Sequence, residues 1–291
     1  VENYEFISTN INEKKNGNKI DFIFEFVDTE KLYVDRINIL GNNVTSEKFI
    51  RDNFLVDEGD PFNEILHLKS LNKLRSTNLF KSVKAEVTKT GNNFKTIDLN
   101  IEEKPTGEIF AAAGHGSDGT SFSFGIKENN YKGEGIKLSS NLELGQGSIK
   151  GALAVTTPNF AYSDRALSSS IESSSIDRLT DFGYKSSLNK FSLGTSYEQF
   201  NDLYFSPNFS ILDETIETDN SASASYKKQQ GSYFDTIFGY RFSYDKRNQP
   251  FRPTSGYISK FSQSLPIVSD GLPILNGYEM SSYKEIADEM V

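Results

Sequence analysis

The feature that most constrains the fold of this chain is a series of alternating segments, each about ten residues long, that begins near Gly107 and continues to the C-terminal end. In each segment, apolar or aromatic residues occupy every second position, and Ser, Gly, Thr or charged residues lie between them. The clearest segment has an aromatic face formed by Phe234, Phe238, Tyr240, Phe242 and Tyr244. A period of two predicts β-strands with one apolar face.

The pattern predicts about ten strands, with polar or glycine-containing turns between them. They fall at 108–115, 122–126, 136–144, 149–155, 167–173, 185–197, 203–212, 234–244, 257–265 and 278–286. Their apolar faces could be buried in a soluble β-sandwich or turned toward lipid in a membrane β-barrel. The connections favour the barrel, because 129–135 and 156–165 are compact whereas 213–232 is long and polar.

Composition narrows the classes of function. The 291 residues carry a formal net charge of -9, which argues against a nucleic-acid partner. There is no cysteine, so disulfides, thiolate metal sites and thiol catalysis are excluded. The sequence contains no run of about 18 apolar residues, so no transmembrane helix is predicted. The first residues show no signal peptide, which fits a mature, a truncated or a cytosolic chain equally.

The N-terminal region contains a repeated hairpin pattern. In the first copy, alternating residues of 20–26 follow Asn16-Gly17, a strong two-residue turn signal, so residues 5–27 are predicted to form a hairpin. The same design recurs at 83–101, around Gly91-Asn92-Asn93. We therefore expect residues 1–29 to be the closing hairpin of a preceding domain, inside which the chain begins.

Residues 30–104 contain a whole copy of the repeat. A strand at 33–40 comes first, then a short helix through Asn53, capped by Thr45 or Ser46, with Phe49 and Ile50 facing inward. Asp60-Pro61 is expected to open a second helix, since Pro suits the first helical position. Its apolar stripe consists of Ile65, Leu68, Leu71 and Leu74. Two strands follow, which gives the order β-α-α-β-β.

This order and its motifs resemble a POTRA domain, the periplasmic module of BamA-type assembly proteins. The POTRA resemblance is carried by Val34-Asp35-Arg36-Ile37-Asn38-Ile39-Leu40-Gly41-Asn42, Ile50-Arg51, Glu58-Gly59-Asp60, Leu71-Asn72-Lys73-Leu74 and Asn78-Leu79-Phe80-Lys81-Ser82-Val83. The barrel resemblance is carried by Lys104-Pro105-Thr106-Gly107-Glu108, Glu128-Asn129-Asn130-Tyr131-Lys132-Gly133-Glu134-Gly135, Thr157-Pro158-Asn159-Phe160 and the segment 244–257. Within these segments, the family's periplasmic turn motifs place Pro158, Arg247, Pro253 and Gly256 at turns.

The resemblance implies an α+β POTRA domain followed by an antiparallel transmembrane β-barrel. The expected division is a hairpin at 1–29, a barrel-proximal POTRA domain at 30–104 and the first part of the barrel at 105–291. The family's plug-loop motif with a Val-Arg-Gly-Phe core is absent from the sequence. We therefore expect an incomplete barrel with about ten of the roughly sixteen strands that the family implies.

The resemblance also implies an activity: insertion and folding of β-barrel precursors in the bacterial outer membrane, with the POTRA part in the periplasm. The implied partners are unfolded outer-membrane protein precursors, accessory outer-membrane lipoproteins and outer-membrane lipid, with no cofactor and no enzymatic chemistry. The first barrel strand would form one side of a lateral gate, through Ile109, Phe110, Ala111, Ala112, Ala113 and Gly114. An ordinary first strand with small residues facing the lumen is the competing interpretation. Glu58 is the candidate for docking a lipoprotein partner, with a simple turn role as its alternative.

Other functions remain open at this point. A two-partner secretion or autotransporter-assembly translocator would share the POTRA-barrel organisation. A passive porin or a soluble β-rich binding protein is less consistent with the small β-α-α-β-β domain. The two histidines, His67 and His115, have no convergent partners, so neither is expected to bind metal or catalyse, and His67 is expected at the surface. Asp245 and Arg247, near Arg252, could form a charge cluster on the lumen side, and a solvated inner face beside a turn is the favoured interpretation.

Overall fold

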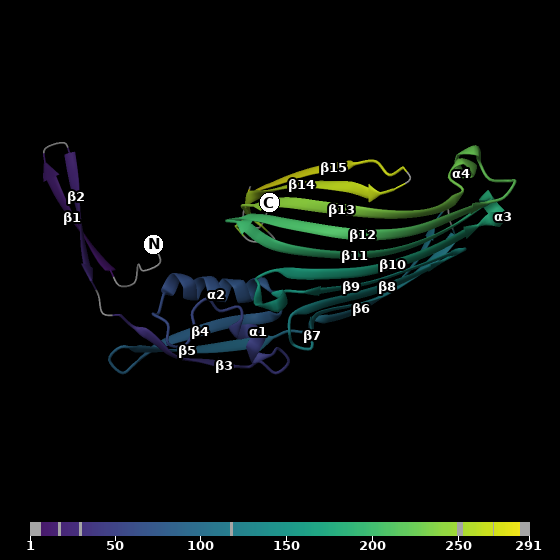
Figure 1. Ribbon diagram of the computed structural model, residues 1–291. Helices are drawn as coiled ribbons and strands as arrows, with labels where there is room; N and C mark the ends of the chain where they lie inside the picture. The colour runs from purple at the N-terminus through teal and green to yellow at the C-terminus, as the bar shows by residue number, and fades with distance from the viewer. Residues whose placement is uncertain are drawn as a thin grey trace. The chain divides into compact units, whose positions relative to one another are not determined.

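The computed structural model describes residues 7–16, 19–28, 31–116, 119–248, 253–269 and 271–285 (Figure 1). The chain divides into two compact units. The first consists of residues 1–105 together with 132–135, and the second of residues 106–131 together with 136–291.

The first unit opens with a hairpin of β1 (Ile7–Asn16) and β2 (Lys19–Asp28), paired antiparallel from Ile7 opposite Asp28 to Asn16 opposite Lys19. The predicted hairpin is confirmed, although Gly17 of its turn signal lies outside the described residues. Phe22 and Phe24 remain 53% and 55% exposed, because a two-stranded ribbon has no second layer against which to bury them.

The rest of the first unit has the predicted order β-α-α-β-β. It consists of β3 (Tyr33–Leu40), α1 (Glu47–Arg51), α2 (Glu64–Ser76), β4 (Phe80–Thr90) and β5 (Phe94–Glu103). The sheet order is β3-β5-β4, with β3 parallel and β4 antiparallel to the central β5. Consequently β3 and β4 are both edge strands of a three-stranded sheet.

The helices bury apolar side chains against this sheet. Ile50 of α1 and Leu74 of α2 are fully buried with Leu99 of β5 in one core cluster. A second cluster joins Val34, Ile37, Val56, Phe62 and Ile97. Burial of this kind, at about 25 cal/mol per Å² of apolar surface, is the main force that holds so short a helix as α1 in place.

The helix starts differ in part from the sequence prediction. Ser46 caps α1, as expected, by accepting a hydrogen bond from Phe49 N at 3.2 Å. The prediction that Asp60-Pro61 opens the second helix was wrong: α2 begins at Glu64, and Asn63 is its N-cap. Pro61 instead forms an isolated antiparallel bridge with Tyr33, so these residues continue along the sheet edge before the helix begins.

The buried stripe of α2 is also rotated. Leu71 and Leu74 are buried as predicted, but Ile65 and Leu68 are 46% and 50% exposed. His67 and Ser70 take their places in the interior. Ser70 explains the rotation, because its hydroxyl accepts a hydrogen bond from Leu55 N at 2.8 Å and donates one to Leu66 O at 2.8 Å. The preceding loop therefore covers this face of the helix.

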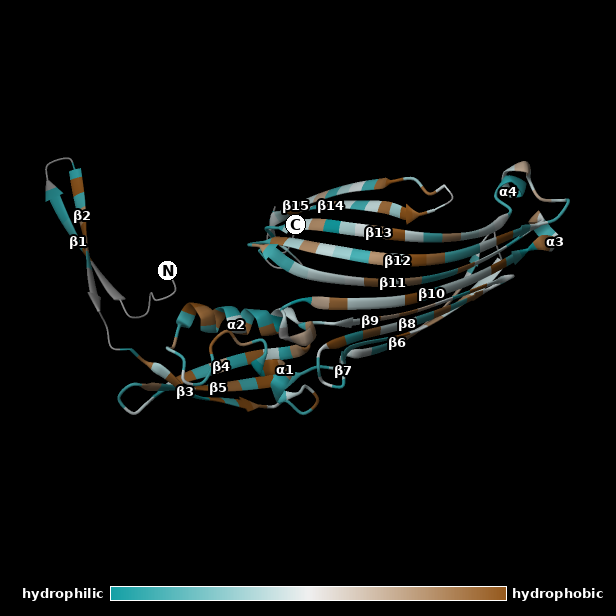
Figure 2. Cartoon of the chain, viewed as in Figure 1, coloured by the Kyte–Doolittle hydropathy of each residue, from teal (hydrophilic) through white to brown (hydrophobic). Residues whose placement is uncertain are grey.

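The second unit is a ten-stranded antiparallel sheet in which each strand pairs with its neighbours in sequence, from β6 to β15. Its strands confirm all ten predicted segments: β6 (Gly107–Gly116), β7 (Gly119–Tyr131), β8 (Ile136–Gly145), β9 (Ser148–Thr157), β10 (Ala166–Arg178), β11 (Tyr184–Phe200), β12 (Leu203–Thr218), β13 (Gly231–Asp245), β14 (Ser255–Val268) and β15 (Leu275–Lys284). The sheet is curved (Figure 1), and hydrophobic and hydrophilic residues alternate along its strands (Figure 2).

Short helical segments interrupt the connections: η2 (Phe160–Tyr162), α3 (Leu179–Phe182) and α4 (Ala224–Lys228). The segment α4 lies in the long polar connection after β12, where the ring of Tyr226 stacks on that of Tyr184 with centroids 4.0 Å apart. Among the described residues, no helix has the length and apolar character needed to cross a membrane.

Candidate functional site

The first candidate site is the strand β6, which lies at one end of the ten-stranded sheet and pairs with β7 alone. All ten of its residues are exposed, and Ile109 is 84% exposed. One side of β6 therefore carries main-chain N–H and C=O groups that no neighbouring strand of the described residues satisfies. All six predicted gate residues, 109–114, lie on this edge strand.

The register with β7 shows which way the β6 side chains face. Ile109, Ala111 and Ala113 lie opposite Ile126, Phe124 and Phe122, which belong to the apolar face of β7. The other set faces the polar side, with Ala112 opposite Ser123 and Gly114 opposite Ser121. Small residues are thus present on both faces of β6, and not on the lumen side alone.

Phe110 on the polar face lies opposite Gly125 and packs over it. An ideal Cβ on Gly125 would lie 2.1 Å from Cζ of Phe110, so only glycine leaves room for the ring. This close pairing of an aromatic ring with a cross-strand glycine fixes the register of β6 on β7. The pair leaves no signal in the sequence, because cross-strand partners depend on a register that alternation alone does not define.

The other end of the sheet is β15, which pairs with β14 only. Most of its residues are exposed, including Tyr278 at 69% and Met280 at 59%. In the part of the chain that the structure describes, the sheet therefore has two open edges, one on β6 and one on β15.

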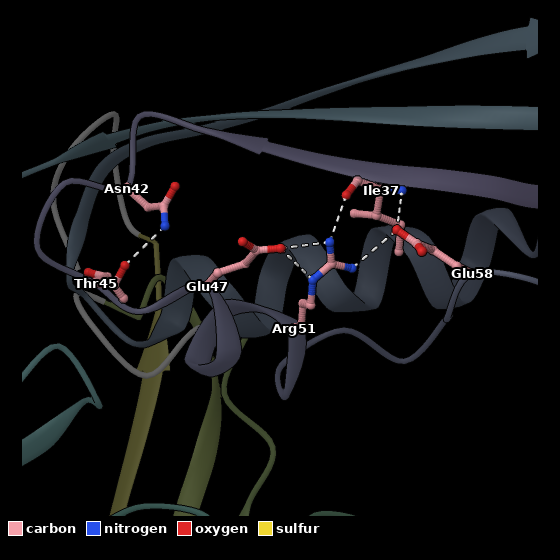
Figure 3. A network of polar contacts seen from close by, with 6 residues as sticks. All are labelled: Ile37, Asn42, Thr45, Glu47, Arg51 and Glu58. Carbon is pink, nitrogen blue, oxygen red and sulfur yellow. Dashed lines mark hydrogen bonds and ion pairs between the residues drawn. The ribbon is translucent and has the colours of Figure 1, made fainter.

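The second candidate site surrounds Glu58 on the first unit (Figure 3). Glu58 Oε1 accepts a hydrogen bond from Ile37 N at 2.9 Å, and Arg51 Nη2 donates one to Ile37 O at 3.0 Å. Arg51 also pairs with Glu58 at 3.3 Å and with Glu47 at 2.8 Å. Glu58 is thus more than a turn residue, because it binds the N–H of Ile37 on the edge strand β3 while Arg51 binds the C=O of the same residue.

The electrostatics of this site follow from those contacts. The hydrogen bond from Ile37 lowers the pKa of Glu58 below its ordinary value; partial burial opposes this, and the positive charge of Arg51 adds to it. Glu58 is therefore ionised at neutral pH and holds its two partners as a carboxylate. A groove beside this network is lined by Arg36, Asn38, Ile39, Leu40, Glu47 and Asp98.

The predicted turn motifs lie at the ends of barrel strands. Arg247 forms a two-pronged contact with Asp245, with Nε–Oδ1 at 2.8 Å and Nη2–Oδ2 at 2.6 Å, and both side chains are largely buried. Gly256 has φ +95°, and an ideal Cβ there would lie 2.1 Å from Lys246 O, so this turn requires glycine. Pro158 follows β9 directly, Pro253 precedes β14, and Arg252 lies outside the described residues.

His67 was expected at the surface, and this prediction was wrong. It is 5% exposed, between the rings of Phe54 and Phe62 at 6.4 and 5.8 Å, and its Nδ1 has no hydrogen-bond partner. Burial is the main reason that its pKa is lowered. Within the described ranges, no group of three or more His, Asp or Glu side chains could hold a metal ion.

The fold and the two sites define a class: a POTRA domain followed by antiparallel barrel strands of the outer-membrane type. Residues 130–282 match the Omp85 superfamily domain, and residues 32–104 match the POTRA family, described as a surface antigen variable number repeat. The chain belongs to the Omp85 superfamily, and its organisation is BamA-type. The barrel interpretation of the alternating strands is thereby confirmed over the soluble sandwich.

Two curated relatives are similar to nearly the whole chain. The chain is 22% identical over 276 residues to the outer membrane protein assembly factor BamA of Neorickettsia risticii, covering 93% of this chain and 37% of that protein. It is 22% identical to BamA of Nitratidesulfovibrio vulgaris, covering 99% of this chain and again 37% of the relative. The chain thus spans well under half the length of these relatives.

Solved structures share the fold. BamA from Haemophilus ducreyi lacking POTRA domains 1–3 matches with a TM-score of 0.64 and 20% identity, over 99% of this chain and 58% of that one. CdiB from Acinetobacter baumannii matches with a TM-score of 0.57 and 13% identity, over 94% of this chain and 53% of that one.

Proposed function

We propose that the whole protein of which this chain carries the POTRA and barrel strands is an outer-membrane assembly factor that inserts and folds β-barrel precursors. The relatives named as outer membrane protein assembly factors support this. The observation that carries the proposal is the Omp85-type sheet itself, which follows a POTRA domain in the same chain, as it does in an assembly factor of this organisation.

The physical route is strand templating. An open edge offers unpaired N–H and C=O groups, to which an incoming precursor strand can hydrogen-bond. In lipid such groups cannot remain unsatisfied, so the edge is useful only at a seam that opens transiently toward the membrane. The six residues 109–114 form one side of that lateral gate. Four of the six, Ala111 to Gly114, have small side chains and leave the free edge weakly packed, while Phe110 holds the strand in register on β7.

The POTRA part would lie in the periplasm and bind precursors by strand addition. Glu58 and its neighbours would form the surface that an accessory lipoprotein contacts, because Glu47, Arg51 and Glu58 gather partly exposed charges of both signs beside the edge strand β3. The apolar barrel face, with Phe122, Phe124 and Ile126 each 48% or more exposed, would contact outer-membrane lipid.

A cysteine cross-link tests the gate. This chain contains no cysteine, and any cysteine elsewhere in the full-length protein is first replaced by serine, so that the introduced pair is specific. In the full-length protein, Ala112→Cys is combined with a cysteine on the closing barrel strand. Oxidation should stop precursor assembly in proteoliposomes, and reduction should restore it. The matched control is the double variant Ala112→Cys/Ser123→Cys. These two positions lie directly opposite each other on β6 and β7, so the disulfide joins two strands that stay paired during assembly. Full assembly by the oxidised seam would overturn the gate.

A second function remains for the same fold: a translocator that exports a partner protein. The similarity to CdiB from two bacteria favours it. Depletion of the full-length protein separates the two. A general assembly factor should lower many unrelated barrel proteins in the outer membrane together, whereas a translocator should lower only one exported partner and leave the barrel proteins unchanged.

A further inference from the structure

The two edges of the POTRA sheet differ in how they are protected, and this difference carries an inference about strand binding. In an extended strand, the N–H and C=O of one residue face the same side, and the side alternates from residue to residue. The outer side of β3 faces no strand of the sheet, since β3 pairs only with β5. Its outward peptide groups are nevertheless largely occupied.

Main-chain atoms cover the first part of the β3 edge. Val34 N donates to Asp60 O at 2.8 Å, and Gly59 N donates to Val34 O at 2.7 Å. The bridge between Tyr33 and Pro61 continues this pairing. The segment before α2 therefore lies along the edge of β3 as a short substitute strand, and it shows that this edge accepts a peptide.

The register of β3 on β5 shifts between Val34 and Arg36, so the next outward residue is Ile37, and side chains cover it. At Ile37, the carboxylate of Glu58 takes the place of a neighbouring strand's C=O, and the guanidinium of Arg51 takes the place of its N–H (Figure 3). Both are charge-assisted hydrogen bonds, which are stronger than neutral ones. Ile39, two residues further along, faces the same edge, and no capping side chain reaches it among the described residues.

This cap is held by contacts that can be exchanged. Arg51 is 34% exposed and Glu58 43% exposed, and both reach the strand through flexible side chains. Exposed ion pairs contribute little to the stability of a fold, so this pair can be removed without disrupting the sheet, but while it is in place an incoming strand must compete with it for Ile37. The main-chain contacts at Val34, in contrast, would stay in place. The segment that opens is therefore 37–40.

The other edge lacks such a cap over most of its length. β4 also pairs only with β5, and Arg75 Nη2 donates to Val83 O at 2.8 Å near its start. Beyond Val83, residues 84–90 are exposed or half-buried, with no second strand beside them in the described sheet. An extended peptide can add to this part of β4 without displacing anything.

We propose that the β3 edge is a closed second docking site for an extended polypeptide strand, and that the Arg51–Glu58 pair is the displaceable cap that confines strand addition to β4 until it is removed. The inference rests on the proposed function, because it takes strand addition to the POTRA sheet as the binding mode. It specifies which edge is open at rest and which two side chains close the other.

Site-specific photo-cross-linking in the full-length protein tests the cap. A photoreactive amino acid replaces Leu40 on β3 or Thr88 on β4, and the probe is a labelled synthetic peptide with the alternating sequence of β8, Ile136–Gly145. In the wild-type background, Thr88 should label and Leu40 should not. In Arg51→Ala/Glu58→Ala, labelling at Leu40 should rise at least about tenfold, since two charge-assisted hydrogen bonds no longer compete, while labelling at Thr88 is unchanged.

The matched control is Glu47→Ala. It removes an ion pair with Arg51 but leaves both contacts to Ile37, so labelling at Leu40 should stay low. Hydrogen exchange provides a second readout that does not depend on the peptide. The Ile37 amide should exchange faster in the double variant, while the amide of the buried Ile97 keeps its protection and shows that the sheet is intact.

Each outcome decides between the ideas. Strong labelling at Leu40 in the wild type overturns the cap. Labelling at Thr88 with none at Leu40 in the double variant overturns the docking site on β3 and leaves the proposed function standing. No labelling at either position overturns strand addition itself, and with it the POTRA part of the proposed function.

Discussion

Gly41 lies so close to the carbonyl of Ile101 that an ideal Cβ on Gly41 would be 2.0 Å from that oxygen. The residue follows β3 directly and has φ +91°, a conformation that disfavours any side chain. The end of β3 is therefore held against β5 by a contact that only glycine allows. The Gly-Asn pair in the POTRA-like motif of the sequence has its structural explanation here.

Gly41→Ala is expected to destabilise the first unit by about 3 kcal/mol or more, because strain from φ and a clash with rigid backbone add together. Gly59→Ala is the matched control: its φ is +92°, but nothing lies within 4 Å of the added Cβ. It should cost about 1–2 kcal/mol, the strain alone. The free energy of unfolding of both variants is measured by urea titration, with hydrogen exchange of the β5 amides as the readout. Equal losses in the two variants would show that the contact with Ile101 is unimportant.

Glu103 gives a prediction with a defined pH dependence. Its carboxylate accepts hydrogen bonds from the N–H groups of Asn43, Val44 and Thr45 at 2.9, 2.9 and 2.6 Å. Burial raises the pKa of Glu103, but the hydroxyl of Thr45 and these three N–H groups outweigh it, so the net pKa lies below the ordinary value of 4.5. The stabilisation is therefore present above pH 4.5 and is lost as the pH falls through the folded-state pKa.

Glu103→Gln should lower the unfolding free energy by about 1–2 kcal/mol at pH 7, and the difference from the wild type should shrink as the pH falls below 4.5. Glu102→Gln is the neighbouring control. Glu102 is 55% exposed and, among the described residues, pairs with the exposed Lys81, so its loss should change stability by less than about 0.5 kcal/mol. A Glu103→Gln deficit that stays constant from pH 7 to pH 3 would contradict the charge-based explanation.

The secondary structure was largely predictable because it depends on local periodicity. The ten barrel strands follow from alternation, and the POTRA order follows from alternation, a helical stripe and turn residues such as Gly91. The start of α2 was missed because Pro61 suits a first helical position in isolation, while in the fold it pairs with Tyr33. A long-range bridge overrode the local preference.

The candidate sites were predictable only as positions. Glu58 and the strand 109–114 were identified from motif resemblance, but their contacts were not. The partner of Glu58 is a peptide group 21 residues away, and that of Phe110 is a glycine on the next strand. The separation between Glu58 and Ile37, and that between Phe110 and Gly125, follow no periodic pattern in the sequence. His67 was misplaced for the same reason, since its burial depends on the loop that Ser70 binds.

His67 makes the first unit sensitive to mild acid. Burial is the largest cause of its lowered pKa, which the charge of Glu64 partly offsets and that of Lys95 reinforces. The folded state therefore favours neutral imidazole, and stability is fully present above the unfolded pKa of about 6.5. It should fall as the pH drops below that value, because the unfolded chain takes up the proton first.

His67→Leu should remove this dependence between pH 7.5 and pH 5.5, at little cost at pH 7.5, because the unpartnered Nδ1 is replaced by an apolar group of similar size. His115→Gln is the control, since the other histidine of the chain lies on the exposed strand β6. Hydrogen exchange of the α2 amides at the two pH values provides the measurement. An unchanged pH dependence in His67→Leu would assign the effect to another group.

The Phe110–Gly125 pair makes the last prediction, on the edge strand of the proposed gate. In Gly125→Ala the new methyl group would lie 2.1 Å from Cζ of Phe110, so the ring must leave its position or β6 must shift on β7. Because Phe110 is 49% exposed, its ring can turn outward, so the cost should be at most about 1 kcal/mol, less than overpacking a buried core. The β6 amides should exchange faster, and pairing between Ala112 and Ser123, read by cysteine cross-linking, should weaken.

The double variant Phe110→Ala/Gly125→Ala separates the clash from other effects, because the methyl group then meets no ring. It should recover most of the β6 protection that Gly125→Ala loses, so the two substitutions should be strongly non-additive. Gly151→Ala on β9 is the matched control, since its nearest contact would be Asn141 O at 4.0 Å. Additive effects in the double variant would mean that Phe110 does not hold β6 in register.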